Sequence, residues 1–383
     1  LPETTQAIGN GAFATCTNLL EVTSASGLRT IGQNAFSSCP NFRSLPMPAT
    51  LERIGEYAFY NCKNFSNFSI PAGVSYIGDH AFDGTDWLTQ STRELLLVGD
   101  GQLLKYNGNA AYLELPAGTR RIYNNAFAMK KTLTEVVLPD TCQWIGQLAF
   151  YGCDNLARIL VPESVTGIDN QAFYISAPHT VPKLAIRGFP GSYAEQFVRA
   201  RWPEGQGFIP VGRIRFLTFG GSLVPDAVVD LGVPFPAPSP PIRAGHAFSG
   251  WYRDMALQMP WRFDQDMAAD SLWLHAGWTL PQVTGMAAQV GANRIATLTW
   301  NALAGATGYE IHAAPTVSGP YALVNIAEGS SYELAMAAGE VRYIRVRAYS
   351  AGAPPYELVQ SYGDFSQSVR LEAGGVAPTG DPT

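Results

Sequence analysis

The residues of this chain best suited to chemistry are its five cysteines, Cys16, Cys39, Cys62, Cys142 and Cys153. All except Cys142 follow an Ala-Phe pair at the same interval, in the pattern Ala-Phe-x-x-Cys. An odd number of equivalent sites is a poor disulfide framework, because it offers no obvious pairing. A zinc site would need a Cys-x-x-Cys pair or accompanying histidines, and neither is present. We therefore expect small buried thiols that stack in one column.

The histidines show no catalytic or metal-binding spacing. His80, His179, His246, His275 and His312 are scattered over the chain. The sequence has no Gly-x-Ser-x-Gly, no phosphate-binding glycine loop after a strand and no His-Glu-x-x-His. Acidic pairs for hydrolysis remain open, because such carboxylates meet only in space. We predict a non-enzymatic protein without a catalytic residue, a metal or a cofactor.

The elements that position these cysteines form a repeat. The frame Ile-Gly-x-x-Ala-Phe-x-x-Cys starts at Ile8, Ile31, Ile54 and Ile145, and looser copies start at Ile77, Ile122 and Ile168. Neighbouring starts lie 23 residues apart, except for one gap of 45 residues between Ile77 and Ile122. A fixed period of this length indicates stacked coils that bury one another's apolar edges.

Within one repeat, Phe68 and Ile70 alternate with polar residues, which predicts a strand that ends at Pro71. Gly78 then permits a tight bend. Ala81 and Phe82 are expected on a short helical or 3₁₀ turn that fills the inside of the coil.

These motifs resemble the BspA-like, or Treponema-type, leucine-rich repeats of bacterial surface proteins. The resemblance covers residues 1–209 and implies a mainly β fold, a right-handed solenoid of about eight coils with short helical or 3₁₀ turns. Residues 83–121 resemble the hairpin-bearing repeat of that family. Residues 184–198 resemble its terminal repeat, in which Ala194, Phe197 and Val198 lie on a capping helix.

Two smaller modules are expected after the solenoid. Residues 210–279 resemble the Listeria–Bacteroides repeat, a small β-grasp-like module, through Gly250-Trp251-Tyr252 and the closing Trp278. Its tryptophans suit either a core or a sugar platform, and a core is the commoner use. Residues 280–373 resemble a fibronectin type III β-sandwich, with Trp300 ending its second strand. Residues 374–383 are expected to form a linker tail.

Solenoids of this kind bind partners through an extended face. Alternation along the expected strands predicts which side chains point outward. Each of these side chains could instead belong to an ordinary solvent-exposed surface that binds no ligand. The predicted binding residues are Glu21, Ser44, Asn67, Glu94, Tyr112, Glu114, Glu135, Arg158 and Lys183.

Composition limits the class of partner. The net charge is −6 and only 15% of residues are charged, which disfavours nucleic acid, whose binding needs clustered Lys and Arg. No apolar run reaches 18 residues, so this segment is not expected to insert into a membrane.

The resemblances imply a monomeric adhesion or interaction protein at the bacterial cell surface or secreted from the cell. It would bind a host or microbial protein or glycan through the solenoid, with the β modules as a stalk. The signal and the anchor are expected to lie outside this segment. The alternatives are a non-catalytic region of a larger cell-wall-associated enzyme, and a structural spacer.

Overall fold

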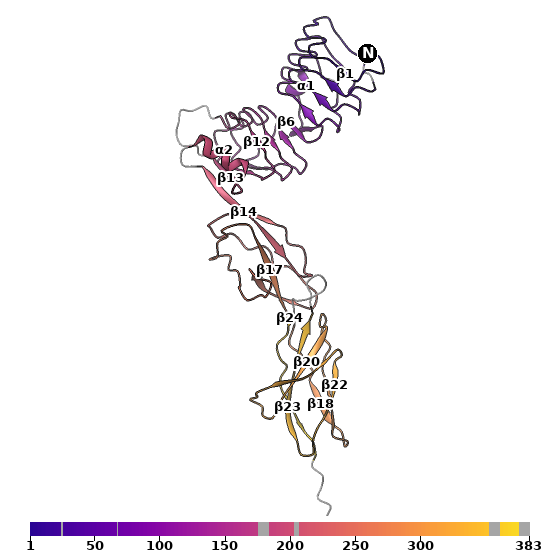
Figure 1. Cartoon of the computed structure of the whole chain (residues 1–383), viewed down its shortest axis with the longest axis vertical. Coiled ribbons are helices and arrows are strands. Elements are labelled where there is room, and N and C mark those ends of the chain that lie inside the picture. The colour runs from indigo at the N-terminus through magenta and orange to yellow at the C-terminus, as the bar shows by residue number, and fades with distance from the viewer. Residues whose placement is uncertain (24–25, 67, 175–183, 203–206, 352–360, 375–383) are drawn as a thin grey trace, which may run out of the picture. The chain divides into compact units, whose positions relative to one another are not determined.

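A computed structural model describes residues 1–23, 26–66, 68–174, 184–202, 207–351 and 361–374 (Figure 1). The chain divides into two compact units, Leu1–Val211 and Gly212–Thr383. Each unit is built mainly from strands.

Unit 1 begins with four two-residue strands, which form one parallel sheet in chain order. Their register places the isoleucines of the frame opposite one another, Ile8 to Ile31 to Ile54 to Ile77. The frame itself is therefore the strand in these coils. The strands are β1 (Ala7–Ile8), β2 (Thr30–Ile31), β3 (Arg53–Ile54) and β4 (Tyr76–Ile77).

The strand expected to end at Pro71 is not found, since residues 68–70 lie outside every strand. Phe65 and Phe68 both reach the core, and their rings stack with centroids 4.1 Å apart. This spacing does not prevent a strand, because Leu133 and Val136 in a later coil are also both buried and Val136 lies in the strand Glu135–Val137. The neighbour differs: residues 95–98 pair antiparallel with residues 102–106 instead of pairing in parallel with residues 68–70.

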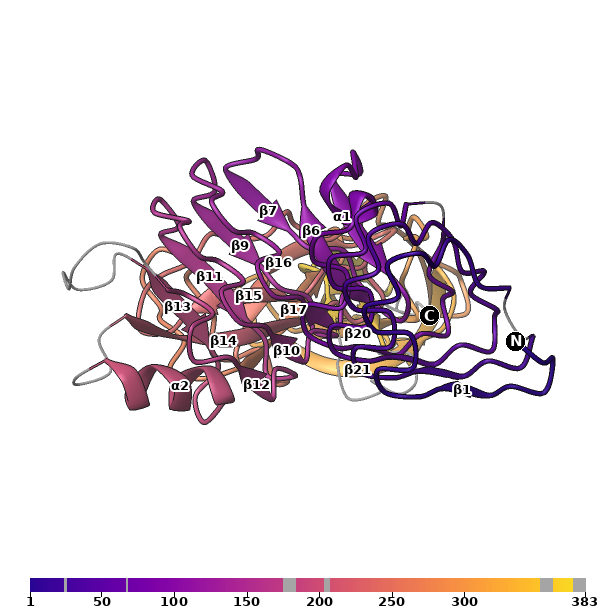
Figure 2. The same ribbon diagram turned by 90° about the horizontal axis from the view of Figure 1, so that it is seen from above.

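The later coils of unit 1 carry two parallel ladders. One ladder joins the strands that contain the isoleucines of the repeat frame. These strands are β8 (Arg121–Ile122), β10 (Trp144–Ile145) and β12 (Gly167–Ile168). In the other, shown side by side in Figure 2, the expected outward strands do form. They are β7 (Tyr112–Glu114), β9 (Glu135–Val137), β11 (Arg158–Val161) and β13 (Ala185–Gly188).

The phenylalanines of the Ala-Phe turns face inward, as the sequence predicts. Phe36 stacks on Phe13 at 5.2 Å and on Phe59 at 5.3 Å, and Phe59 stacks on Phe82 at 5.4 Å, all with nearly parallel rings. Phe36, Phe59 and Phe82 are completely buried. Adjacent turns are also joined by backbone bonds, because the Phe36 amide donates to Ala58 at 2.8 Å. The turns therefore hold neighbouring coils together through stacked rings and backbone hydrogen bonds.

The glycine of the frame has a different role from the expected tight bend. A Cβ on Gly55 would lie 2.5 Å from the backbone nitrogen of Gln33 and 2.6 Å from the carbonyl carbon of Gly32. Gly55 does not have the left-handed φ that only glycine adopts easily. Glycine is needed because the backbones of neighbouring coils touch at this point.

The cysteine column forms as predicted. The thiols of Cys39, Cys62 and Cys153 each donate to the carbonyl of the phenylalanine one coil earlier, at 2.9, 2.9 and 3.0 Å. All five cysteines are free thiols, and Cys16 alone is exposed. Burial raises the pKa of Cys62 to about 12 and that of Cys153 to about 11.

We expect iodoacetamide at pH 8 to modify Cys16 first and the four buried cysteines only on unfolding. The thiolate is the reactive form, and raised pKa values keep Cys62 and Cys153 protonated well above pH 8. Peptide mass spectrometry against time would measure this order. Modification of Cys62 at the rate of Cys16 in the folded chain would contradict the buried column.

The cap predicted at the end of the solenoid is confirmed. Helix α2 (Tyr193–Arg201) follows β13 and buries Ala194, Phe197 and Val198 against the core of the last coils. Strand β14 (Phe208–Leu217) pairs with β13 through Phe208–Pro210. Lys183 and the other residues between 175 and 183 lie outside the described residues.

In unit 2, the first module joins the later part of β14 to β15 (Ala227–Asp230), β16 (Ala247–Tyr252) and β17 (Leu272–Thr279). Trp251 and Trp278 are buried in its core, as expected. Trp273 is not a core residue: it is 50% exposed and lies under the guanidinium of Arg215, 5.2 Å from the ring centre.

The second module of unit 2 is a β-sandwich around Trp300. One sheet contains β18 (Ala287–Val290), β19 (Ile295–Thr299) and β22 (Ser331–Ala335). The other contains β21 (Ala322–Ala327), β20 (Gly308–Ala314), β23 (Val341–Ser350), β24 (Ser361–Tyr362) and β25 (Val369–Glu372). The predicted two-sheet fold is therefore present.

Candidate binding surfaces of the solenoid

The ladder β7–β9–β11–β13 brings four of the predicted binding residues together. Tyr112, Glu135 and Arg158 lie opposite one another in register, and Glu114 begins the next outward row, which ends at Arg187. Tyr112 is 55% exposed although it is large and partly apolar. We call these five residues the strand face.

The strand face changes from acidic to basic along the stack. Desolvation and the negative charges of Glu114 and Glu135 raise the pKa of Tyr112 above its ordinary value. Arg187 reaches back across β11 to Glu135, at 3.8 Å. Arg187 was not among the predicted binding residues, although it follows the buried Ile186 on the strand and therefore faces outward.

Three other predicted residues, Glu21, Ser44 and Glu94, do not join this face. Glu21 and Ser44 share one isolated parallel bridge in the first coils. Glu94 precedes β5, and its carbonyl accepts from the Asn107 amide at 2.7 Å, so it lies outside the parallel ladder of β7. Asn67, like Lys183, lies outside the described residues.

The long gap in the repeat contains the predicted hairpin. Strand β5 (Leu95–Val98) pairs antiparallel with β6 (Gln102–Tyr106), which also joins the ladder of β8. Leu96 and Leu104 pack into the core of the first coils, whereas Leu103 and Tyr106 pack into the core of the later coils. The hairpin therefore links two hydrophobic cores within unit 1.

Tyr123 links the coils on the two sides of this gap. Its buried hydroxyl accepts a hydrogen bond from the Ala81 amide at 2.7 Å and donates to the Gly78 carbonyl. These groups come from a turn 42 or more residues earlier. The same amide and carbonyl also bond to each other at 3.3 Å, as the equivalent groups do in the regular turns, so Tyr123 adds a contact across the gap.

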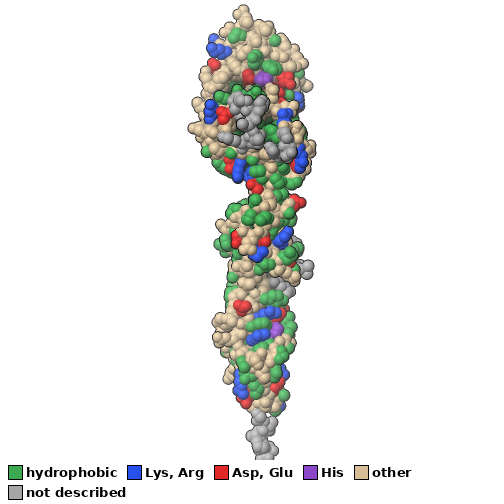
Figure 3. All heavy atoms as spheres, turned by 90° about the vertical axis from the view of Figure 1, so that its left-hand side faces the viewer, with side chains coloured by type: hydrophobic (Ala, Val, Ile, Leu, Met, Phe, Trp, Pro, Cys, Tyr) green, Lys and Arg blue, Asp and Glu red, His purple; other side chains and the backbone are tan. Residues whose placement is uncertain are grey.

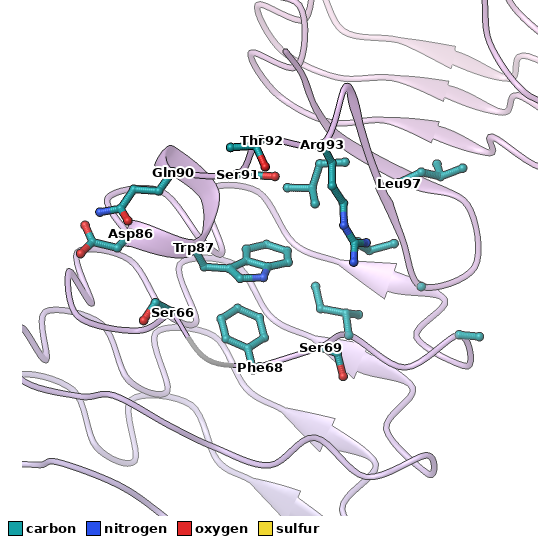
Figure 4. A pocket seen from close by; sticks show the side chains of 15 residues that line it. Ser66, Phe68, Ser69, Asp86, Trp87, Gln90, Ser91, Thr92, Arg93 and Leu97 are labelled. Atoms are coloured by element: carbon teal, nitrogen blue, oxygen red, sulfur yellow. The ribbon is translucent and has the colours of Figure 1, made fainter. Parts of the chain in front are cut away.

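A pocket of about 550 Å³ opens where the hairpin replaces a regular coil (Figure 4). One wall comes from Ser66 and residues 68–72, and the other comes from the short helix α1 (Asp86–Thr89) and residues 90–99. We call it the break pocket. Phe68 and Trp87 stack at its base with ring centres 4.6 Å apart.

Helix α1 is held in place from both ends. Thr85 accepts a hydrogen bond from the Leu88 amide through its side chain, which caps the start of the helix. The Lys105 ammonium donates to the carbonyls of Leu88 and Thr89, at 3.1 and 3.2 Å. Trp87 is therefore fixed at the pocket by neighbouring backbone contacts.

The structure contains little that suggests metal or membrane chemistry. In the described parts of the chain, no three His, Cys, Asp or Glu side chains gather into a metal-binding group. Among the helices of those same parts, none is long and apolar enough to cross a membrane. On the face shown in Figure 3, acidic and basic side chains are interspersed, and neither sign forms a continuous patch.

Family comparison agrees with this architecture. Residues 1–94 and 102–182 match the model of the BspA type leucine rich repeat region, in six copies. The solenoid is a BspA-type leucine-rich repeat region. Residues 213–277 match the Listeria–Bacteroides repeat domain. These families are repeat domains without catalytic activity, and a BspA-type region fits an interaction role at the bacterial cell surface.

Individual relatives of this chain are distant. A "Putative Gly-rich membrane protein" of Evansella cellulosilytica is 26% identical over 126 residues, which are 30% of this chain and 15% of the relative. A leucine rich cell surface protein from Faecalibacterium prausnitzii is 25% identical, with 47% of this chain and 56% of that chain covered and a TM-score of 0.30. An Fn3-like protein from Clostridium thermocellum is 24% identical. The match covers 25% of this chain and 94% of that chain, with a TM-score of 0.20.

Proposed function

We propose that this chain is a non-enzymatic interaction protein of the bacterial cell surface, which binds an extracellular protein or glycan through its BspA-type solenoid. The β modules of unit 2 then serve as a stalk. The main support for the proposal is the strand face. There the register of the parallel strands places Tyr112, Glu135 and Arg158 side by side, and the ring of Tyr112 is exposed. Exposed tyrosine and arginine are the side chains that most often supply binding energy at interfaces.

A binding screen of the full chain against extracellular-matrix proteins and glycans tests this proposal. We expect the double variant Tyr112→Ala/Glu114→Ala to weaken binding about tenfold or more, because it removes the aromatic anchor and an adjacent carboxylate. Both side chains are exposed, so the circular dichroism spectrum is expected to stay unchanged.

Tyr174→Ala is the matched control, because it removes a tyrosine that is 54% exposed outside the strand face. Binding that survives the double variant unchanged would exclude the strand face as the site. If the chain bound no ligand in the screen, a structural spacer would be the better reading.

The alternative is a binding or spacer region of a larger cell-wall-associated enzyme. The chain spans only 15% of the length of the Evansella relative. The sequence of the whole gene product would separate the two proposals, because a catalytic domain in it would support the alternative.

A further inference from the structure

We propose that the break pocket is a second binding site, which takes an acidic sugar: a pyranose that carries a carboxylate, at the end of or within a glycan. This inference rests on the proposed interaction function and names one class of ligand for it. The pocket volume of about 550 Å³ lies inside the range of small-molecule sites, roughly 300–1,000 Å³.

Two donors of the pocket are free to bind an acceptor. Figure 4 shows the Arg93 side chain extending into the pocket from the hairpin side, opposite Trp87 and above Ser69. Neither the Arg93 guanidinium nor the indole N–H of Trp87 forms a hydrogen bond or ion pair with any residue that the structure describes. A guanidinium matches a carboxylate in shape and charge, since two N–H groups can donate to its two oxygens.

The remaining lining includes polar groups that suit a sugar ring, among them Asp86, whose carboxylate can accept hydrogen bonds from sugar hydroxyls on the side away from Arg93. Ser66, Ser69, Gln90 and Ser91 line the pocket with hydroxyl and amide groups. Such groups pair with the hydroxyls of a pyranose, which both donate and accept hydrogen bonds. Phe68 and Trp87 supply the aromatic surface that the C–H face of a sugar packs against.

The arrangement arises only because the repeat is interrupted. In the regular coils, Phe36 and Phe59 stack on neighbours on both sides and are completely buried. At the gap, Trp87 packs against Phe68 and Phe82 and remains partly exposed at the pocket. A site of this kind is therefore expected at the break in the repeat and not in each regular coil.

The test is titration of the full chain with methyl glycosides of N-acetylneuraminic acid and glucuronic acid, with methyl glucoside as the neutral control. We expect at least one acidic glycoside to bind and the neutral one to bind more weakly. Arg93→Gln is expected to raise the Kd of the acidic glycoside about 10- to 100-fold, the usual effect of losing a charged hydrogen bond. Arg93 is exposed, so this variant is expected to fold normally.

Lys131→Gln provides the matched control, because it removes one positive charge from an exposed side chain elsewhere in unit 1. Equal Kd values for Arg93→Gln and the unchanged chain would overturn the inference, as would preference for the neutral glycoside or for a peptide with a free C-terminal carboxylate. If no glycoside bound while a protein ligand bound the strand face, the inference would fail and the proposed function would stand.

Discussion

Replacing Phe59 with alanine is expected to lower the free energy of unfolding of unit 1 by about 3–5 kcal/mol, the usual cost of removing a buried phenylalanine. Phe59 is completely buried and stacks on Phe36, Phe65 and Phe82. Its loss leaves a cavity between two coils whose backbones are tied together at the same turn. Urea unfolding followed by circular dichroism would measure the change.

Phe13→Ala is the matched control for Phe59→Ala. Phe13 has the same place in the frame, but it is only partly buried and stacks on Phe36 alone. Its loss is expected to cost clearly less, because less surface is returned to water. If both variants lost the same stability, the contacts between coils would not be the source of the stabilisation.

Gly55→Ala is expected to destabilise unit 1 by about 1–3 kcal/mol or more, as overpacking of a tight contact does. The added Cβ would meet the backbone of the preceding coil at 2.5 Å, and that backbone has no flexible end that could move aside. The coils would have to separate, which strains the parallel pairing of β2 with β3.

Gly9→Ala isolates this effect, since Gly9 has the same position in the first coil and a Cβ there meets no atom within 4 Å. Thermal unfolding of both variants is the measurement. We expect Gly9→Ala to leave the Tm nearly unchanged or slightly higher, because alanine restricts the unfolded chain more than glycine does. A similar fall in Tm for both would contradict the close-approach explanation.

Periodicity predicted the parts of the fold that depend on repetition. The inward Phe36 and Phe59 and the thiol column of Cys39 and Cys62 follow from one apolar frame stacked on itself, whereas the capping helix with Phe197 was expected from the family resemblance. Such positions are defined by sequence spacing, because each coil repeats the environment of the previous one.

Periodicity did not predict the features that depend on how neighbouring coils pack in three dimensions. Alternation at Phe68 and Ile70 predicted a strand, but the next strand along the chain, β5, pairs with β6, and residues 68–70 lie outside every strand. The close approach at Gly55 involves the backbone of another coil, so no local pattern could reveal it. Arg187 could have been predicted from its own strand, because it alternates with the buried Ile186 and Gly188.

The break pocket was partly predictable. The irregular stretch at residues 83–121 marked the place, and a hairpin was expected there. The meeting of Phe68 with Trp87, and the direction of Arg93, depend on how the hairpin packs between two cores. That packing is tertiary, so the composition of the pocket could not be read from the sequence.

The central claim is that unit 1 binds the ligand and unit 2 does not. Hydrogen–deuterium exchange of the full chain, with and without a ligand found in the screen, tests it most directly. We predict slower exchange in peptides from residues 86–99 or 112–161 and no change in residues 212–351. Slower exchange confined to residues 212–351, with unit 1 unaffected, would contradict the account.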